Sequence, residues 1–179
     1  MQDDPKAHDQ STADYSDFLW RVHAYINDYI KFADAKAAFI AAACSGVIGA
    51  LVASTLFDSC FRNSLSDWTI MQFAGMLGLI LLVISFGLSI ATIQPRLWSK
   101  SGSGFIYWGS VIAHGSAKDH TAAVHQLTQR QMSEETAKHV FTLSMIADRK
   151  FKRVSWALAV GVLGGLLSAV VLFIQRSLR

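Results

Sequence analysis

Basic side chains stand beside three long stretches of the sequence that contain no charged residue. Lys36 precedes the first stretch, Arg96 follows the second, and Lys150 and Arg153 precede the third. If the stretches cross a membrane, these side chains meet at one depth, around the rim of a low-dielectric region. Coulomb attraction rises where water is excluded, so such a rim could hold a small anion. The competing interpretation is that these residues contact lipid headgroups and only set the topology, and their spacing by itself favours it.

An aromatic block, Phe105-Ile106-Tyr107-Trp108, follows a Gly- and Ser-rich turn at residues 99–104. The rings of Phe105, Tyr107 and Trp108 could supply a stacking face for a planar base. The sequence therefore offers cations for a small anion and rings for a planar group.

Asp34 is an unusual residue to find beside an apolar stretch. A carboxylate so close to a bilayer gains nothing from topology, and Asp34 and Lys36 point to different faces of a helix. We therefore expect one of them to meet another helix or a ligand. A local pair between Asp34 and Lys31 is the alternative.

The elements that position these residues begin with three predicted transmembrane helices, at residues 37–57, 68–93 and 155–174. None of these stretches holds a charged residue, and about 20 apolar residues suffice to cross a bilayer. Upstream of the first, apolar residues recur at steps of three and four, which predicts an amphipathic helix over residues 12–36. Because neither Gly nor Pro intervenes, this helix should continue unbroken to Phe57. The polar residues 1–11 are predicted to be a disordered tail.

The segment at residues 94–154 is predicted to be mostly helical. Pro95 ends the second span, a helix is expected over Ala117–Gln131, and Ser133 precedes a long helix from about Glu134 to Ile174. The predicted fold is an all-α membrane protein with three transmembrane helices, the first and third extended into a cytoplasmic helical bundle.

The distribution of Lys and Arg predicts the orientation. The loop at residues 58–67 holds one such residue, whereas residues 94–154 hold nine. Positive charge favours the cytoplasmic side, so the N-terminus and residues 94–154 are expected there. The loop at 58–67 and the tail at 175–179 would then be external.

Small residues recur at four-residue steps in two of the spans: Ala38, Ala42, Gly46, Ala50 and Ser54 in the first, and Gly161 with Gly165 in the third. Such rows let helix backbones approach, so they predict helix contacts without naming the partner helices. The spans offer only Ser, Thr and Gln72 to line a pore. Any membrane lesion would therefore require a homo-oligomer.

Signals for catalysis are weak. Metal-binding spacings are absent, and we expect no metal site, no cofactor and no enzyme activity. The loose group His114, Asp119, His120 and His125 is interpreted as a solvated helical face. Nucleic-acid binding is not expected either, because no basic run is interleaved with aromatics along a soluble face.

Four blocks together resemble the Pycsar transmembrane effectors, membrane proteins of bacterial anti-phage defence. The blocks are FADAKAAFI at 32–40, QPRLW at 94–98, GFIYWG at 104–109 and LSMIADRKFKRVSWAL at 143–158. The resemblance runs from about Phe18 to the end of the third span, and the acidic leading tail lies outside it.

The resemblance implies a function in the bacterial inner membrane, in contact with membrane lipid. In such systems a partner cyclase makes cyclic CMP or cyclic UMP, and the effector responds by impairing the membrane, so that growth arrests or infection aborts. The residues that match the blocks of the family are Asp34, Lys36, Pro95, Tyr107, Leu143 and Lys150.

The assignment of ligand contacts is our own chemical hypothesis. It gives the cyclic phosphate to Arg96, Lys150 or Lys36 and the base to Tyr107. It treats Asp34, Trp108 and Arg153 as structural or switch positions. In this hypothesis the messenger binds where the helices meet and favours one arrangement of the oligomer. The alternative function is a membrane-anchored scaffold or sensor subunit that docks a cytoplasmic partner without forming a lesion.

Overall fold

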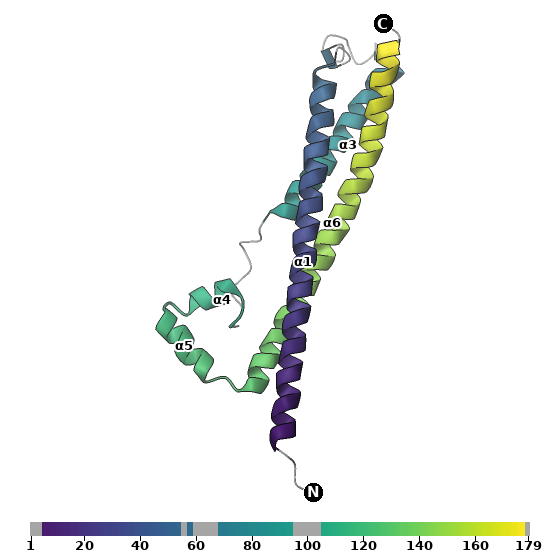
Figure 1. Ribbon diagram of the computed structural model, residues 1–179. Coiled ribbons are helices and arrows are strands. Elements are labelled where there is room, and N and C mark those ends of the chain that lie inside the picture. Colours follow the sequence, from purple (N-terminus) through teal and green to yellow (C-terminus); the bar gives the residue numbers. More distant parts are fainter. Residues whose placement is uncertain (1–4, 55–56, 59–67, 95–104, 178–179) are drawn as a thin grey trace. The chain divides into compact units, whose positions relative to one another are not determined.

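The protein is mostly helical in the part that its computed structural model describes, which is residues 5–54, 57–58, 68–94 and 105–177 (Figure 1). The helices are α1 (Pro5–Val52), α3 (Ile70–Ile93), α4 (Trp108–Ala113), α5 (Ala117–His125) and α6 (Gln129–Ser177). These described residues include no strand. The predicted all-α class is confirmed.

Three of the helices, α1, α3 and α6, are long and apolar enough to cross a membrane. The prediction of three transmembrane helices is confirmed at this level. α1 has 48 residues and α6 has 49. At 1.5 Å per residue each is roughly 72 Å long, more than twice the thickness of a hydrocarbon core. Both helices therefore continue well beyond the length that a bilayer can cover.

The chain divides into two compact units. One, here called the membrane unit, comprises Phe32–Gln94 and Arg149–Arg179. The other, here called the polar unit, comprises Met1–Lys31 and Pro95–Asp148. Each unit is described by itself below.

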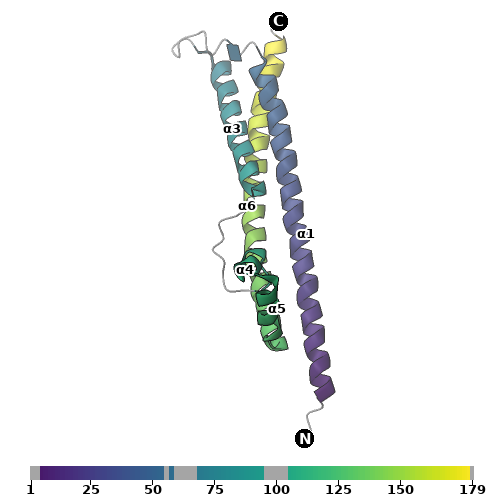
Figure 2. The ribbon, with the colours of Figure 1, turned by 90° about the vertical axis from the view of Figure 1, so that its left-hand side faces the viewer.

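In the membrane unit, the segments of α1, α3 and α6 lie side by side around a small apolar core (Figures 1 and 2). The residues of α1 in this core are Ala33, Ala37, Ile40, Cys44 and Leu51. They alternate mostly by three and four positions, which keeps one side of a helix facing its neighbours. Leu82 of α3 and Val154 and Ala157 of α6 complete the core.

The small-residue rows are only partly the contact surfaces of this chain. Ala38, Ala42, Gly46 and Ala50 are exposed, and a Cβ added at Gly46 or Gly165 would meet nothing within 4 Å. Steps of four residues advance about 40° around a helix each time, so such a row winds away from any single neighbour. Gly161 is in contact as expected, since its added Cβ would lie 2.6 Å from Ser85 Oγ.

The backbones of α3 and α6 approach each other closely at two glycines. A Cβ on Gly164 would lie 2.9 Å from Leu81 Cβ and 3.1 Å from the carbonyl oxygen of Gly78. A Cβ on Gly78 would lie 2.6 Å from Ser168 Oγ. Without Cβ atoms at these positions the two backbones pack directly, which is a favoured way to hold helices together in lipid.

In the polar unit, α1 and α6 meet at His23 and His139, whose rings stack at 5.3 Å between centroids. Figure 1 shows α4 and α5 following each other around a tight corner. Gly115 makes this corner with φ 77°, a left-handed conformation that glycine adopts without strain. Ser116 then caps α5, because its Oγ accepts a hydrogen bond from the Asp119 N–H at 3.1 Å.

The bounds of α1 differ from the prediction at both ends. The helix begins at Pro5 and therefore includes most of the tail that was expected to be disordered. Proline suits a first helical position, since its fixed φ is already helical and its missing N–H is not needed there. The helix ends at Val52 rather than Phe57. The Ser54 hydroxyl and N–H both donate to the Leu51 carbonyl, which turns the chain out of the helix.

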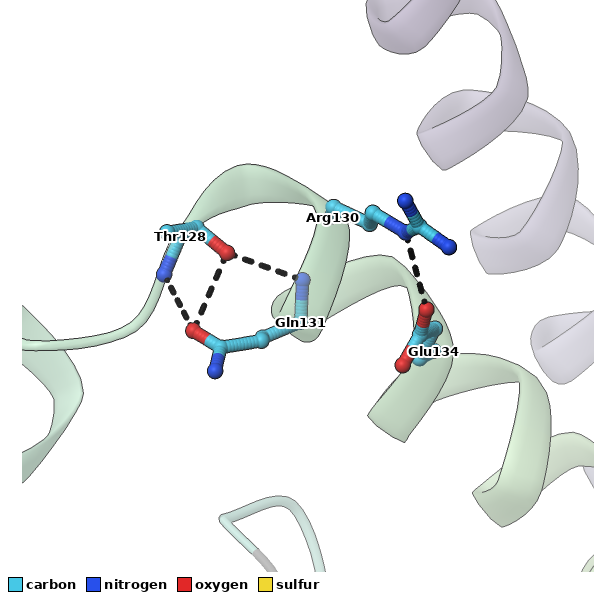
Figure 3. Close-up of polar contacts among 4 residues, drawn as sticks. All are labelled: Thr128, Arg130, Gln131 and Glu134. Atoms are coloured by element: carbon cyan, nitrogen blue, oxygen red, sulfur yellow. Dashed lines mark hydrogen bonds and ion pairs between the residues drawn. The ribbon is translucent and has the colours of Figure 1, made fainter.

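The predicted helix over Ala117–Gln131 is interrupted. α5 ends at His125 and α6 begins at Gln129, earlier than the expected Glu134. Figure 3 shows the reason, a capping box in which Thr128 and Gln131 bond to each other's backbone N–H.

Candidate functional site

The central feature of the candidate site is an ion pair between two helices of the membrane unit. Lys150 Nζ on α6 lies 2.5 Å from Oδ1 and 2.7 Å from Oδ2 of Asp34 on α1. The side chains are 17% and 32% exposed, respectively. Lys31, the alternative partner considered for Asp34, pairs with Asp28 at 3.0 Å instead. Asp34 therefore meets another helix, as one of the two sequence interpretations proposed.

The partial burial of this pair decides how it behaves. A fully exposed ion pair contributes little, because water and salt screen it. A charge that is mostly removed from water is costly to leave alone, so each member of the pair needs the other or a substitute of the same sign. The pair therefore holds α1 against α6. Its cation, the Lys150 ammonium, is mostly removed from water and needs a negatively charged partner, either Asp34 or another anion.

Lys36 lies near Asp34 in the sequence but makes a different contact. Its Nζ sits 4.3 Å from the centroid of the Phe32 ring, one turn back on α1. Lys36 is exposed. A cation over an aromatic face is held weakly, so this ammonium remains accessible.

Arg153 joins α6 to the end of α3. Its Nη1 donates to the Ala91 carbonyl at 3.1 Å. Ala91 is in the last turn of α3, where carbonyls have no partner within the helix and the helix dipole favours a cation. The structural or switch role expected for Arg153 stays a prediction. Arg96 lies outside the described residues.

Tyr107 and Trp108 belong to the polar unit, where they begin α4. Their rings are 5.4 Å apart and inclined at 47°. Tyr107 is half-buried, and Trp108 is 55% exposed. A Cβ on Gly109 would lie 2.6 Å from Tyr107 Cε1, so the glycine gives the Tyr107 ring room to fold against the backbone.

The histidines interpreted as a solvated face are partly packed instead. His114 stacks on Phe105 at 5.6 Å and touches His120 at 5.0 Å between centroids. Both histidines are half-buried, because the Gly115 corner folds α4 and α5 toward each other. His125 is exposed, as expected.

Sequence reasoning missed a buried polar contact at the centre of the membrane unit. Ser85 Oγ of α3 donates to the Ala157 carbonyl of α6 at 2.7 Å, and Cys44 Sγ of α1 donates to Ser85 Oγ at 3.4 Å. The signal was present in the spacing of the small and polar residues of α3. The buried positions of this helix are Gln72, Gly75, Gly78, Leu82, Ser85, Ser89 and Thr92.

These features define the class of protein: a three-span α-helical membrane protein with an ion pair between two of its long helices, beside the apolar core. The family model for the Pycsar effector protein domain matches residues 18–175. The chain belongs to this family of transmembrane effectors in anti-phage defence. The resemblance inferred from the four sequence blocks is thereby confirmed.

A curated relative agrees with the family. The Pycsar effector protein SaPycTM of Staphylococcus aureus is 25% identical over 141 residues, covering 79% of this chain and 84% of the relative. No solved structure matches the chain.

Proposed function

We propose that this chain is a non-catalytic effector that responds to cyclic CMP or cyclic UMP, made by a partner cyclase, by impairing the bacterial inner membrane. The result would be growth arrest or abortive infection. In this proposal the N-terminus and the polar unit face the cytoplasm, where the messenger is made. Membership of the Pycsar effector family and three membrane-crossing helices support it.

The observation that carries the proposal is the Asp34–Lys150 pair. A cyclic nucleotide has one phosphate with a single negative charge, the same charge as the Asp34 carboxylate. At Lys150 the phosphate would compete with Asp34 and leave Asp34 without its partner on α6. A ligand that binds one arrangement better shifts the population toward it. The pair thus offers a direct link between anion binding and the packing of α1 against α6.

The other ligand contacts remain proposals based on chemistry. The exposed ammonium of Lys36 and the guanidinium of Arg96 are further candidates for the phosphate, and the ring of Tyr107 is the candidate for the base. For Tyr107 a pair of variants separates ring from hydroxyl. Tyr107→Phe should keep messenger affinity, and Tyr107→Leu should weaken it about tenfold, since stacking on one base contributes about 1–3 kcal/mol.

Self-association is part of the proposal. The polar groups of α3 are used inside the chain: Ser85 bonds to α6, and Ser89 and Thr92 bond to carbonyls of their own helix. A conducting path lined by polar residues would need more than these groups. We therefore propose that several copies associate and membrane lipid is displaced between them.

Dye leakage from proteoliposomes that contain the purified chain tests the function. Cyclic CMP or cyclic UMP should release dye, and cyclic AMP should not. Lys150→Met should abolish the response, whereas Lys31→Met should keep it, because Lys31 also pairs with an aspartate but is 74% exposed. Calorimetry on Lys36→Ala, Arg96→Ala and Lys150→Met measures the contribution of each cation to affinity.

The outcomes separate the proposal from its alternative. If neither pyrimidine nucleotide causes leakage, the effector mechanism is wrong. If a nucleotide binds and yet cells that express the chain keep their membrane potential when it is supplied, the scaffold or sensor function is favoured instead. Unchanged affinity in all three cation variants would remove the proposed phosphate contacts.

A further inference from the structure

An exposed row of apolar side chains runs along α1 in the polar unit. It is called the aromatic stripe here and consists of Tyr15, Phe18, Val22, Tyr25 and Tyr29. Tyr15, Phe18, Tyr25 and Tyr29 are 51%, 60%, 62% and 45% exposed, and Val22 is half-buried. Solvent-exposed large side chains gathered on one face are uncommon unless that face has a partner.

The aromatic stripe is separate from the side of α1 that packs within the chain. The packed side includes Leu19, which is buried, and His23, which stacks on His139 of α6. At 100° per residue, the centre of the stripe lies about 90° around the helix from the centre of the packed side. α1 therefore has two apolar faces in this unit, and α6 contacts one of them.

The spacing of the stripe identifies the kind of partner. Its positions advance by three, four, three and four residues, an average of 3.5. This period is the one that keeps a seam facing another helix in a left-handed coiled coil. The rings of Tyr25 and Tyr29 are already arranged against each other, 4.7 Å between centroids.

We infer that the aromatic stripe is the surface on which the α1 helix of a second copy of this chain packs, parallel and in register. The proposed function includes the association of several copies, and this inference rests on that association and identifies the surface that makes it. Two copies in one membrane enter it in the same direction, because α1 continues from the stripe into the first candidate span. The membrane then also fixes their depth, so each stripe residue faces the same residue of the other copy.

The charges beside the stripe permit such a pair. On its flank away from the packed side, Asp17 bonds to Arg21 and Asp28 bonds to Lys31, each at 3.0 Å. Each pair is neutral within its own helix. Asp14 lies on the same flank and adds one negative charge per copy at the start of the stripe. Beyond that position, two identical helices can approach along this flank without a net repulsion between them.

The size of the surface sets the strength of the contact. A buried aromatic side chain removes about 150–250 Å² from water, and about half of each of the four rings is exposed, so the stripe offers about 300–500 Å² per copy. A standard stable interface buries about 800 Å² per partner. The pair should therefore be weak in dilute solution and form when a shared membrane raises the effective concentration. A weak contact is one that a ligand can strengthen.

Cysteine cross-linking in proteoliposomes without nucleotide tests the inference. In a background of Cys44→Ala and Cys60→Ser, mild oxidation of Tyr25→Cys or Phe18→Cys should give a disulfide-linked dimer on a non-reducing gel. Facing positions in a parallel helix pair bring cysteine Cα atoms within disulfide range. Ala24→Cys is the matched control, because Ala24 is exposed beside Tyr25 but points away from the stripe. It should give at least fivefold less dimer.

Lipid dilution distinguishes a specific pair from random collision, and the specific dimer should persist when lipid is raised tenfold. Equal cross-linking at Tyr25→Cys and Ala24→Cys, or monomer only in both, overturns the inference. The same oxidation can be repeated in native membranes. If the cysteine variants cross-link there to a different protein and not to a second copy, the inference is wrong and the stripe has another partner. Cross-linking needs no nucleotide, so the two experiments can fail separately. A dimer in this experiment together with no nucleotide-induced leakage in the dye assay contradicts only the effector mechanism, and nucleotide-induced leakage without this dimer contradicts only the stripe.

Discussion

Lys150 donates to both carboxylate oxygens of Asp34, so a single ammonium ties α6 to α1 across 116 positions of sequence. Neither side chain is fully buried. The pair lies between a screened surface ion pair, which contributes almost nothing, and a buried pair, whose loss of one member is severe. In the proposed mechanism, this intermediate setting lets the pair hold two helices together and still be opened by an anion.

Removing one member of the pair should destabilise the membrane unit. We predict that Asp34→Asn or Lys150→Met lowers the free energy of unfolding by about 1–3 kcal/mol, because one partly buried charge loses its partner. Thermal unfolding in detergent measures the change. Lys31→Met should cost less than about 0.5 kcal/mol, since its pair with Asp28 is exposed.

An exchange of the two charges is the sharper control. Asp34→Lys combined with Lys150→Asp keeps a pair of opposite charges at the same place. It should recover part of the loss seen in either single variant. Equal melting temperatures for wild type and both single variants would show that the pair does not hold α1 to α6.

Three glycines of α6 should respond very differently to the same added methyl group. At Gly164 a Cβ would meet Leu81 Cβ at 2.9 Å and two backbone atoms of α3 at 3.1 Å, so the helices must separate. We predict a loss of about 1–3 kcal/mol for Gly164→Ala. At Gly161 the Cβ would press on Ser85 Oγ, which can rotate but then gives up its bond to Ala157.

Gly165→Ala is the matched control for this series, because nothing lies within 4 Å of its added Cβ. It should leave stability unchanged or slightly raised, since alanine favours a helix more than glycine does. The expected order of destabilisation is Gly164→Ala, then Gly161→Ala, then Gly165→Ala. Thermal unfolding in detergent provides the measurement, and any order that places Gly165→Ala first contradicts the observed packing of α3 on α6.

The start of α6 should depend on Thr128 and hardly at all on Arg130 (Figure 3). Thr128 Oγ1 accepts from the Gln131 N–H at 3.3 Å, and Gln131 Oε1 accepts from the Thr128 N–H at 2.8 Å. Loss of such a cap costs about 0.5–2 kcal/mol. We predict that Thr128→Ala speeds hydrogen exchange of the first amides of α6 about threefold or more.

The control variant for Thr128→Ala removes the neighbouring ion pair of Arg130 with Glu134. Arg130 Nε bonds to Glu134 at 3.1 Å, but the side chains are 89% and 54% exposed. Arg130→Ala should therefore change the same exchange rates by less than about twofold, because exposed i,i+4 pairs add about 0.3–0.5 kcal/mol. Similar exchange in both variants would mean that the cap does not order this turn.

The sequence predicted the features that one helix decides by itself. Charge-free runs identified the three spans, and the lack of Gly and Pro before the first of them predicted that the leading helix continues unbroken into it, as α1 does. Either Asp34 or Lys36 was expected to meet another helix or a ligand, because a carboxylate beside a span had no topological reason and the two side chains point to different faces. That Asp34 pairs with Lys150 could not be known, since nothing local to either residue records a contact across 116 positions.

The wrong predictions, the start of α6 and the contact faces of the spans, came from sequence patterns that are compatible with two structures. Ser133 with its following acids and Thr128 with Gln131 both resemble a helix start, and the second pair forms the actual cap. Rows of small residues at steps of four were treated as contact faces, but the contact face of α1 alternates steps of three and four, from Ala33 to Ala37 and then Ile40. The spacing of the small and polar residues of α3 indicates a buried side of that helix. That Ser85 on this side bonds to Ala157 and Cys44 depends on the positions of three helices at once and could not be predicted from the spacing.

Acid should loosen the polar unit through His139, a half-buried residue outside the spans. Burial, and then the charge of His23, lower the pKa of His139 below its ordinary value of 6.5. In the unfolded chain the same side chain takes up its proton at the ordinary pKa. The contribution of His139 to stability is therefore complete above about pH 6.5, falls as the pH drops from there to the lowered pKa, and then levels off.

Hydrogen exchange of residues 129–148, corrected for the intrinsic effect of pH on exchange, measures this dependence of stability on pH. The neighbouring charges Glu135 and Lys138 pair with each other at 2.9 Å. We predict that His139→Gln flattens the slope and that His125→Gln, on the exposed end of α5, leaves it unchanged; an undiminished slope in His139→Gln would assign the acid sensitivity to other groups.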